Sequence, residues 1–281
     1  MKSVRCHPRV HLHVQASGRW STVEPPLATL PRDGSLDGLY VPDPGEAWVE
    51  YDMMAVEMRV MAAEAGETRM LDAFREGRDL HTENTMVIFG WSELPADWQG
   101  KQDERRTFGK TFGHRLDYLG DPRRCMDIPN AQKLGLTAER LQRAAEAYFT
   151  RYPRLRAYHR RKTQEYAVTR EARTFLGRRR RGFSAGMALV RELVNHPFQG
   201  GVADVFNRTA LQVWQALRPL GGRFVFQRHD AATWGVPVGQ VDEAMRRIEA
   251  VFDAPWRING HDVRIPIAWK EVRYADLSSP V

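Results

Sequence analysis

Cysteine and long apolar runs are both scarce in this sequence of 281 residues. The two isolated cysteines, Cys6 and Cys125, provide neither a disulfide framework nor a zinc cluster, and they favour a reducing compartment. No apolar run approaches the roughly 18 residues of a membrane-spanning helix, and the N-terminal segment lacks the apolar stretch of a signal peptide. We therefore expect a cytoplasmic protein without a membrane partner.

The rest of the composition is that of a globular protein. Hydrophobic residues make up 42% and charged residues 27% of the chain, which is long enough for one large domain or two subdomains. Lysine and arginine (42) outnumber aspartate and glutamate (35), which gives a formal net charge of +7. This charge favours a polyanionic partner, but it excludes little because many basic proteins bind no nucleic acid.

The spacing of apolar residues, glycine and proline predicts an α+β fold, in which a sheet carries an all-helical insertion. The segment up to Gly45 is rich in Pro, Gly and Ser, with extended pieces such as residues 10–14. We predict strands at 47–52 and 263–267 and a tight hairpin at 226–231. The predicted helices cover 56–66, 69–75, 79–89, 104–118, 137–152, 154–170, 187–217 and 241–252.

Two acids stand where strands end. Asp52 closes the first predicted strand, and Asp230 lies in the predicted hairpin. Carboxylates are hard ligands that suit Mg²⁺, and two of them bridging two ions about 4 Å apart recur in phosphoryl-transfer enzymes. Aspartate is also common in turns, so either residue alone is more often structural, by roughly three to one. With a cationic helix between them in sequence, the pair predicts a nucleotidyl transferase.

That helix carries a polar stripe. Arg106, Lys110, His114 and Tyr118 are spaced four apart and therefore share one slowly drifting face. Two cations followed by two rings could hold a triphosphate and then stack on its base. A solvated basic face is the more common role of such a stripe, and the two phenylalanines on the opposite face fit both interpretations.

Three further features are less specific. Gly109 and Gly113 each cost the helix about 1 kcal/mol relative to alanine, which suggests that another group approaches its backbone closely. The run Arg178–Arg181 could bind phosphates bidentately, although a solvated loop or a localisation-type patch is nearly as good an explanation. Gln199-Gly-Gly within a helical stretch suggests close packing, and as an isolated signal it is weak.

Taken in order, these segments resemble family A DNA polymerases, the DNA polymerase I family and its phage relatives. Ser17-Gly18-Arg19-Trp-Ser is similar to the family's T-G-R-L-S, and Pro25-Pro-Leu-Ala-Thr-Leu-Pro31 follows in place of D-P-N-L-Q-N-I-P. Tyr51-Asp52-Met-Met-Ala-Val-Glu57-Met-Arg59-Val is similar to D-Y-S-Q-I-E-L-R-V. Phe74-Arg-Glu-Gly-Arg-Asp-Leu-His81-Thr-Glu nearly repeats F-R-E-G-R-D-I-H-T-E.

The second half of the chain continues the resemblance. Its segments are Arg106-x₃-Lys110-x₇-Tyr118, Phe175-Leu-Gly-Arg-Arg-Arg, Asn195-x₃-Gln199-Gly and Gln227-Arg-His229-Asp230. Each is moderately specific alone, whereas the ordered set covers nearly the whole chain and reverses the odds given above for the two acids. The resemblance implies a template-directed DNA polymerase that adds dNTPs to the 3′-hydroxyl of a primer–template.

The resemblance also implies a role for each matched residue. Asp52, Asp230 and the backbone carbonyl of Met53 would hold two Mg²⁺ ions, for which Mn²⁺ could substitute, and Lys110 would join the two acids as a catalytic residue. Glu57 would be a steric gate against the ribonucleotide 2′-hydroxyl. The nucleotide-binding residues would be Glu57, His81, Arg106, Lys110, His114 and Tyr118. The DNA-binding residues would be Arg19, Arg178, Arg179, Asn195, Gln199, Gln227 and His229.

By the same resemblance, residues 1–45 would be an extended segment packing on the palm. Residues 46–75 and 186–281 would form the palm, and residues 76–185 the fingers. Nothing upstream of Arg19 could form the family's thumb or exonuclease domain. The chain would therefore be either the C-terminal part of a split polymerase with a separately encoded thumb/exonuclease subunit, or a distributive minimal enzyme. The protein would be located in the cytoplasm of a bacterial or phage-infected cell.

Three positions depart from the family pattern. His114 stands where the family has Phe or Tyr, Arg115 replaces a glycine, and Ala231 replaces the acid that follows the hairpin aspartate. We still expect activity, because the acid that Ala231 replaces is the least essential of the family's three acids. Glu57 argues against an RNA polymerase. A non-catalytic remnant that binds DNA or a replication partner stays open through His114 and Ala231, although retention of both acids disfavours it.

Overall fold

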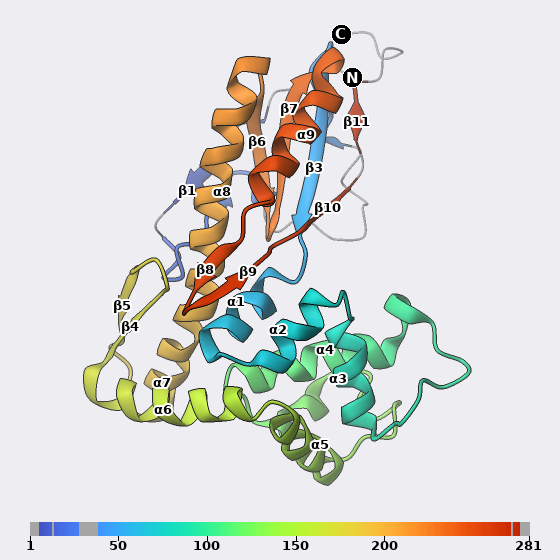
Figure 1. The fold of residues 1–281 in the computed structure, drawn as a ribbon, viewed down its shortest axis with the longest axis vertical. Helices are drawn as coiled ribbons and strands as arrows, with labels where there is room; N and C mark the ends of the chain where they lie inside the picture. The colour runs from blue at the N-terminus through green and yellow to red at the C-terminus, as the bar shows by residue number, and fades with distance from the viewer. Residues whose placement is uncertain (1–5, 13, 28–38, 271, 276–281) are drawn as a thin grey trace. The chain divides into compact units, whose positions relative to one another are not determined.

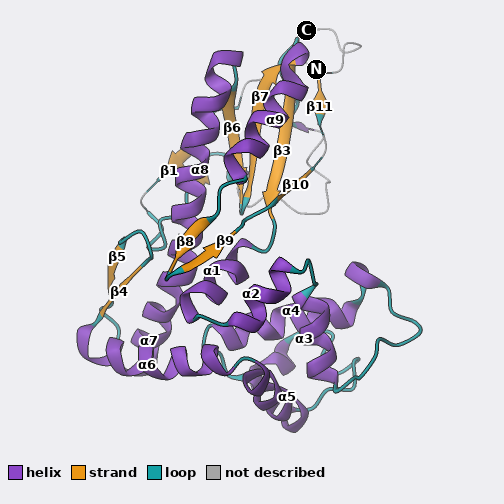
Figure 2. Cartoon of the chain, viewed as in Figure 1, coloured by secondary structure: helices purple, strands orange, loops and turns teal. Residues whose placement is uncertain are grey.

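The computed structural model describes residues 6–12, 14–27, 39–270 and 272–275 (Figure 1). Residues 28–31 of the proline-rich segment and His13 of the predicted extended piece lie outside the described residues. The chain forms two compact units. The first comprises Met1–Val60, Leu176–Arg178 and Gln199–Val281, and the second comprises Met61–Phe175 and Arg179–Phe198. Sheet and helix are both well represented, which confirms the predicted α+β class (Figure 2).

The first unit contains an antiparallel sheet with the order β10-β3-β7-β6, and β11 also pairs with β3. Its strands are β3 (Glu46–Met53), β6 (Arg223–Arg228), β7 (Ala231–Pro237), β10 (Ile267–Trp269) and β11 (Arg273–Tyr274). Strand β3 is central and nearly all buried, as its run of Trp, Val and Tyr predicts. Two small ribbons pair β1 (Arg9–His11) with β2 (Ser21–Val23), and β8 (Trp256–Ile258) with β9 (His261–Val263).

Helices α8 (Gly201–Leu217) and α9 (Val241–Phe252) lie on the same side of this sheet (Figure 1). Helix α9 buries Val241, Ala244, Ile248 and Phe252, whose spacing of three to four residues gives it one apolar face. The ring of Phe252 meets Tyr51 of β3 edge-on, with 5.1 Å between the ring centroids. This contact fixes the helix against the strand that carries Asp52.

Helix α1 (Val56–Ala65) follows β3, and the second unit is mainly helical. Its helices are α2 (Thr68–Arg75), α3 (Leu80–Phe89), α4 (Glu104–Asp117), α5 (Ala138–Arg151), α6 (Pro153–Thr169) and α7 (Gly186–Asn195). A ribbon of β4 (Glu171–Arg173) and β5 (Arg179–Arg181) completes it. Asp79, Asp103 and Thr137 cap helices α3, α4 and α5 by accepting backbone hydrogen bonds, which explains why these helices begin where they do.

The predicted helices are confirmed, with one interruption. The stretch 187–217 is divided by a π-helical turn, His196–Gly200 (η5), because Pro197 has no amide hydrogen to continue the α-helical pattern. Short 3₁₀ segments connect other elements. They are η3 (Gly100–Gln102), η4 (Pro122–Asp127), η6 (Arg218–Leu220) and η7 (Val238–Gln240). None of the helices in the described part of the chain is long and apolar enough to cross a membrane.

The predicted strand at 263–267 is wrong. Strand β9 ends at Val263 and β10 begins at Ile267, so the predicted segment is the break between two strands. Pro266 lies in this break, and its missing amide hydrogen cannot take part in a ladder. The carbonyl of Pro266 instead accepts a hydrogen bond from the Met54 amide at 2.9 Å.

Candidate active site

Asp52 and Asp230 are brought together by the pairing of β3 with β7. Asp52 lies opposite Ala231 in the register, and the Met53 amide donates to the Asp230 carbonyl at 3.1 Å. The hairpin between β6 and β7 is tight, as predicted, because only His229 and Asp230 separate the strands. His229 has a positive φ of 55°, the backbone conformation that the first residue of a type II′ hairpin turn adopts.

The donor set at this strand end suits a hard divalent cation. The side chains of Asp52 and Asp230 are 43% and 28% exposed, so both carboxylates are accessible from solvent. Among the described residues there is no group of three or more His, Cys, Asp or Glu side chains that could enclose a metal ion. Mg²⁺ commonly binds through one or two carboxylates and completes its shell with water and substrate phosphates. The residues present therefore fit Mg²⁺, or Mn²⁺ in its place.

Arg19, in the first unit, contacts both Glu57 and Asp230. Its Nη2 lies 3.1 Å from Glu57 Oε2 and 3.6 Å from Asp230 Oδ1. All three side chains are between a fifth and a third exposed, so the ion pairs are partly shielded from water. Gln227, also in this unit, donates from Nε2 to the His229 carbonyl at 2.7 Å and so braces the hairpin turn. Its Oε1 is buried and has no hydrogen-bond partner among the described residues.

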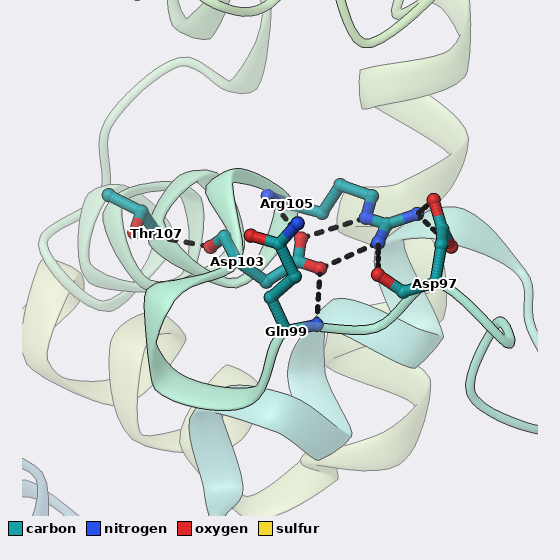
Figure 3. A network of polar contacts seen from close by, with 5 residues as sticks. All are labelled: Asp97, Gln99, Asp103, Arg105 and Thr107. Carbon is teal, nitrogen blue, oxygen red and sulfur yellow. Dashed lines mark hydrogen bonds and ion pairs between the residues drawn. The ribbon is translucent and has the colours of Figure 1, made fainter.

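In the second unit, α4 presents the predicted polar stripe. Its other face buries Phe108, Phe112 and Leu116, whereas Lys110 is exposed. The start of the helix is fixed by the network in Figure 3, in which Arg105 pairs with both Asp97 and the capping residue Asp103. Hydrogen bonds from Arg105 lower the pKa of Asp103 to about 2. The helix is thus anchored at its first turn and along its apolar face.

Asp79 holds Arg106 in a defined position at the beginning of the stripe. Arg106 donates through both Nε and Nη2 to the Asp79 carboxylate at 2.9 Å, and Nε also lies 3.3 Å from the Thr82 hydroxyl. Burial alone would raise the pKa of Asp79, but the hydrogen bonds from Arg106 and Thr82 outweigh it and lower the value to about 2. The sequence pattern places Asp79 at the start of a helix, but it does not indicate that Asp79 pairs with Arg106.

His81 lies beside the middle of the stripe, with its ring centroid 5.8 Å from that of His114. Burial, followed by the positive charges of His114, Lys110 and Arg106, lowers the pKa of His81 to about 3. The ring is therefore neutral at physiological pH and can donate one hydrogen bond without adding charge. Tyr118 caps the end of α4, and its ring lies 6.0 Å from that of Phe198.

The glycines of α4 differ in their surroundings. A Cβ on Gly109 would lie 2.2 Å from Thr85 Oγ1, so α3 does approach the helix backbone there, as predicted. A Cβ on Gly113 would meet its nearest neighbour, the Tyr148 ring, at an ordinary 3.7 Å. The close approach is therefore confirmed at Gly109, and the space at Gly113 would admit a methyl group.

The four consecutive arginines are paired with carboxylates. Arg178 Nε lies 2.7 Å from Asp204, and Arg180 Nη2 lies 2.9 Å from Glu192. Arg179 and Arg181 share Glu171 at 3.6 and 3.7 Å. The remaining predicted DNA contacts are Asn195, at the end of α7, and Gln199, within the π-helical turn. Asn195 Oδ1 is buried, and no described residue donates a hydrogen bond to it.

The family model for DNA polymerase family A matches residues 1–270. The chain belongs to DNA polymerase family A. Thermostable DNA polymerase I of Thermus filiformis is 27% identical in an alignment of 278 residues that covers 94% of this chain and 31% of that protein. DNA polymerase I of Lactococcus lactis is 27% identical over 252 residues, covering 85% of this chain and 28% of that protein.

The fold of this family A chain is also that of a solved polymerase domain. The POL domain of Pol1 from M. smegmatis, in complex with DNA primer-template and dNTP, matches with a TM-score of 0.80 at 24% identity. The match covers 96% of this chain and 47% of that one. The chain thus spans about a third of the length of the curated relatives it matches.

Proposed function

We propose that this chain is a template-directed DNA polymerase that transfers a nucleotide from a dNTP to a primer 3′-hydroxyl by two-metal-ion catalysis. The observation that carries the proposal is the pairing of β3 with β7, which presents Asp52 and Asp230 at one strand end. Membership of family A and the order of its motifs support the same assignment. Primer–template DNA and dNTPs are the partners that this function requires.

Asp52 and Asp230 would hold the metal ions, with the Met53 carbonyl as a further oxygen ligand. When bound, the ions lower the pKa of the attacking 3′-hydroxyl and offset the charge of the triphosphate. Glu57, held by Arg19 at 3.1 Å, would occupy the space that a ribonucleotide 2′-hydroxyl needs. Because Arg19 holds the Glu57 carboxylate in place, this carboxylate can sterically exclude the 2′-hydroxyl.

The stripe on α4 would bind the incoming nucleotide. Arg106 already presents its guanidinium to a carboxylate through two donors, the geometry that also suits a phosphate. Lys110 is exposed and would supply a mobile charge to the triphosphate, and neutral His81 would donate a hydrogen bond. His114 and Tyr118 would lie against the base pair. Template or primer contacts would come from Arg19, Arg178, Arg179, Asn195, Gln199, Gln227 and His229.

We assign residues 46–75 and 186–281 to a palm and residues 76–185 to fingers, with residues 1–45 packed on the palm. The second compact unit also contains residues 61–75 and 186–198, which this assignment gives to the palm, and it leaves out Leu176–Arg178. Asn195 and Gln227 each have a buried oxygen that accepts no hydrogen bond from the described residues, which fits side chains that bind a donor on nucleic acid.

The function is tested by primer extension on a labelled primer–template with Mg²⁺ and the four dNTPs, using Asp230→Ala as the control. Extension by the wild-type chain that is lost in the variant supports a polymerase active by itself. Extension that appears only when a thumb-containing fragment is added in trans supports a split polymerase with a separately encoded subunit. Duplex binding without extension under either condition would contradict the polymerase assignment and favour a non-catalytic DNA-binding remnant.

A further inference from the structure

Glu50 is an unusual acid because it lies inside the central strand of the sheet. It precedes Asp52 by two residues on β3, so both side chains point to the same face. Its side chain is only 6% exposed, and Oε2 accepts a hydrogen bond from the Thr233 hydroxyl at 3.1 Å. A buried carboxylate is strongly destabilising unless a cation compensates its charge.

Among the described residues, Lys270 is the cation nearest to Glu50. Its Nζ lies 2.9 Å from Glu50 Oε1, and Arg228 adds a more distant contact at 3.7 Å. The Lys270 backbone amide also donates to the Glu50 carbonyl at 2.8 Å, directly after the pairing of β10 with β3. Both the main chain and the ammonium group of Lys270 are thus tied to one residue of β3.

The same ammonium group reaches Asp52. Lys270 Nζ lies 3.7 Å from Asp52 Oδ2, which is a charge–charge contact and too long for a hydrogen bond. The Lys270 side chain is 38% exposed and that of Asp52 is 43% exposed, so the contact stands at the solvent-facing edge of the buried Glu50. A fixed positive charge therefore lies beside an acid that a divalent ion would need.

We propose that Lys270, anchored by Glu50, is a positioning residue that weakens divalent-metal binding at Asp52 and sets the metal concentration the protein requires. The inference rests on the proposed function, which makes Asp52 a metal ligand. An ammonium this close to the Asp52 carboxylate repels a divalent cation that binds there. Glu50 holds the Lys270 ammonium 3.7 Å from the Asp52 carboxylate and offsets part of the ammonium charge.

The test is Mn²⁺ binding to the whole chain without nucleotide or DNA, followed by the loss of the free-ion EPR signal. Lys270→Met should bind Mn²⁺ about tenfold more tightly, the size expected when one unit charge near a divalent ion is removed in a largely aqueous dielectric. Lys270→Arg keeps the charge and should bind as the wild type does. Glu50→Gln should bind more weakly, because Lys270 then lacks its compensating acid.

A purely structural role for Lys270 would not raise the Mn²⁺ affinity in Lys270→Met and lower it in Glu50→Gln. Lys270→Met could fail to fold because Glu50 would then be buried without its cation. In that case the double variant Glu50→Gln/Lys270→Met, which removes both charges, takes its place in the test. The double variant should bind Mn²⁺ more tightly than Glu50→Gln alone. Unchanged or weaker binding by the folded Lys270→Met protein, or by the double variant relative to Glu50→Gln, overturns the proposal.

Asp52→Asn separates this proposal from the proposed function. If Asp52→Asn loses Mn²⁺ affinity and Lys270→Met does not gain it, only the role of Lys270 is wrong. If Asp52→Asn binds Mn²⁺ as tightly as the wild type, Asp52 is not a metal ligand, and the polymerase mechanism and the role of Lys270 are both overturned.

Discussion

The guanidinium of Arg19 lies 3.1 Å from the carboxylate of Glu57. The same nitrogen is 3.6 Å from Asp230, so one cation links the proposed sugar gate with a proposed metal ligand. Both side chains of the Arg19–Glu57 pair are about three-quarters shielded from solvent, which limits screening of their attraction. The orientation of Glu57 is therefore set by a residue that precedes it by 38 positions in the chain.

Replacing Glu57 by alanine should raise ribonucleotide incorporation, because the space for a 2′-hydroxyl opens. We expect the ratio of kcat/KM for dNTP over rNTP to fall by roughly tenfold or more, measured by single-nucleotide primer extension. Glu57→Gln is the matched control, since it removes the charge that pairs with Arg19 but keeps the volume. Unchanged discrimination in Glu57→Ala, or an equal loss in Glu57→Gln, would rule out a steric gate.

Removing either strand-end acid should abolish turnover. Metal-bound stabilisation of the transition state is worth several kcal/mol, so Asp52→Ala and Asp230→Ala should each lower kcat by at least about a thousandfold. Primer–template affinity, followed by fluorescence anisotropy, should change little. Asp242→Ala, at an exposed position in the first turn of α9, controls for loss of an acid elsewhere in the same unit. Loss of folding in the first two variants would instead identify Asp52 and Asp230 as structural acids.

The local parts of this site follow from the sequence, because strand alternation, hairpin length and helical spacing are short-range properties. The end of β3, the turn at Asp230 and the polar stripe of α4 were all predicted in this way. The partners of these residues are long-range. Lys270 meets Glu50 across 220 positions, and no pattern within either segment indicates the other. Only the presence of an acid inside an apolar strand signals that Glu50 needs a partner.

The arginine run shows the same limit. Four adjacent arginines predict either phosphate contacts or a solvated loop, because sequence gives their charge but not their neighbours. In the structure, Arg178 pairs with Asp204, 26 positions further along the chain, and Arg180 pairs with Glu192, 12 positions further along. The charge available to nucleic acid is therefore smaller than the run alone suggests, and phosphate binding there would have to compete with these ion pairs.

Lys110 should affect nucleotide use more than primer binding. Lys110→Ala removes an exposed charge from the stripe without touching the apolar face of α4, so the KM for dNTP should rise by roughly 10-fold or more. Lys101→Ala, on the exposed η3 segment that precedes α4, removes the same charge outside the stripe and should leave the KM unchanged. Equal losses of dNTP use and duplex affinity in Lys110→Ala would show a general DNA contact.

His81 should make stability depend on pH below neutrality. Burial and the neighbouring cations lower its pKa in the folded protein to about 3, whereas an unfolded histidine titrates near 6.5. Between these values the unfolded chain binds a proton that the folded chain does not. The free energy of unfolding therefore falls as the pH falls, by up to about 1.4 kcal/mol per pH unit.

Urea unfolding at pH 7 and pH 5 checks this expectation. The wild type should lose up to about 2 kcal/mol more than His81→Asn over this interval, because the variant lacks the titrating ring. An NMR titration of the His81 ring gives an independent measure and should show the neutral form below pH 5. Equal pH dependence in the two proteins would mean that folding does not lower the pKa of His81.

The two glycines of α4 provide a matched pair for the packing of this helix. Gly109→Ala places a methyl group 2.2 Å from Thr85 Oγ1, and Thr85 is fully buried and donates to the His81 carbonyl at 2.7 Å. Because Thr85 cannot move without breaking that bond, we expect Gly109→Ala to lower the free energy of unfolding by about 1–3 kcal/mol. Gly113→Ala meets no such obstacle and should raise it by up to about 1 kcal/mol through helix propensity.

Opposite signs in urea unfolding would establish that α3 and α4 pack as tightly as described and that their separation at Gly109 is fixed. Since His81 belongs to α3 and Arg106 and Lys110 to α4, the same displacement should also weaken dNTP use in Gly109→Ala. Gly113→Ala should leave dNTP use unchanged. A stabilised Gly109→Ala protein with normal dNTP use would show that the two helices tolerate separation and that the stripe does not depend on their spacing.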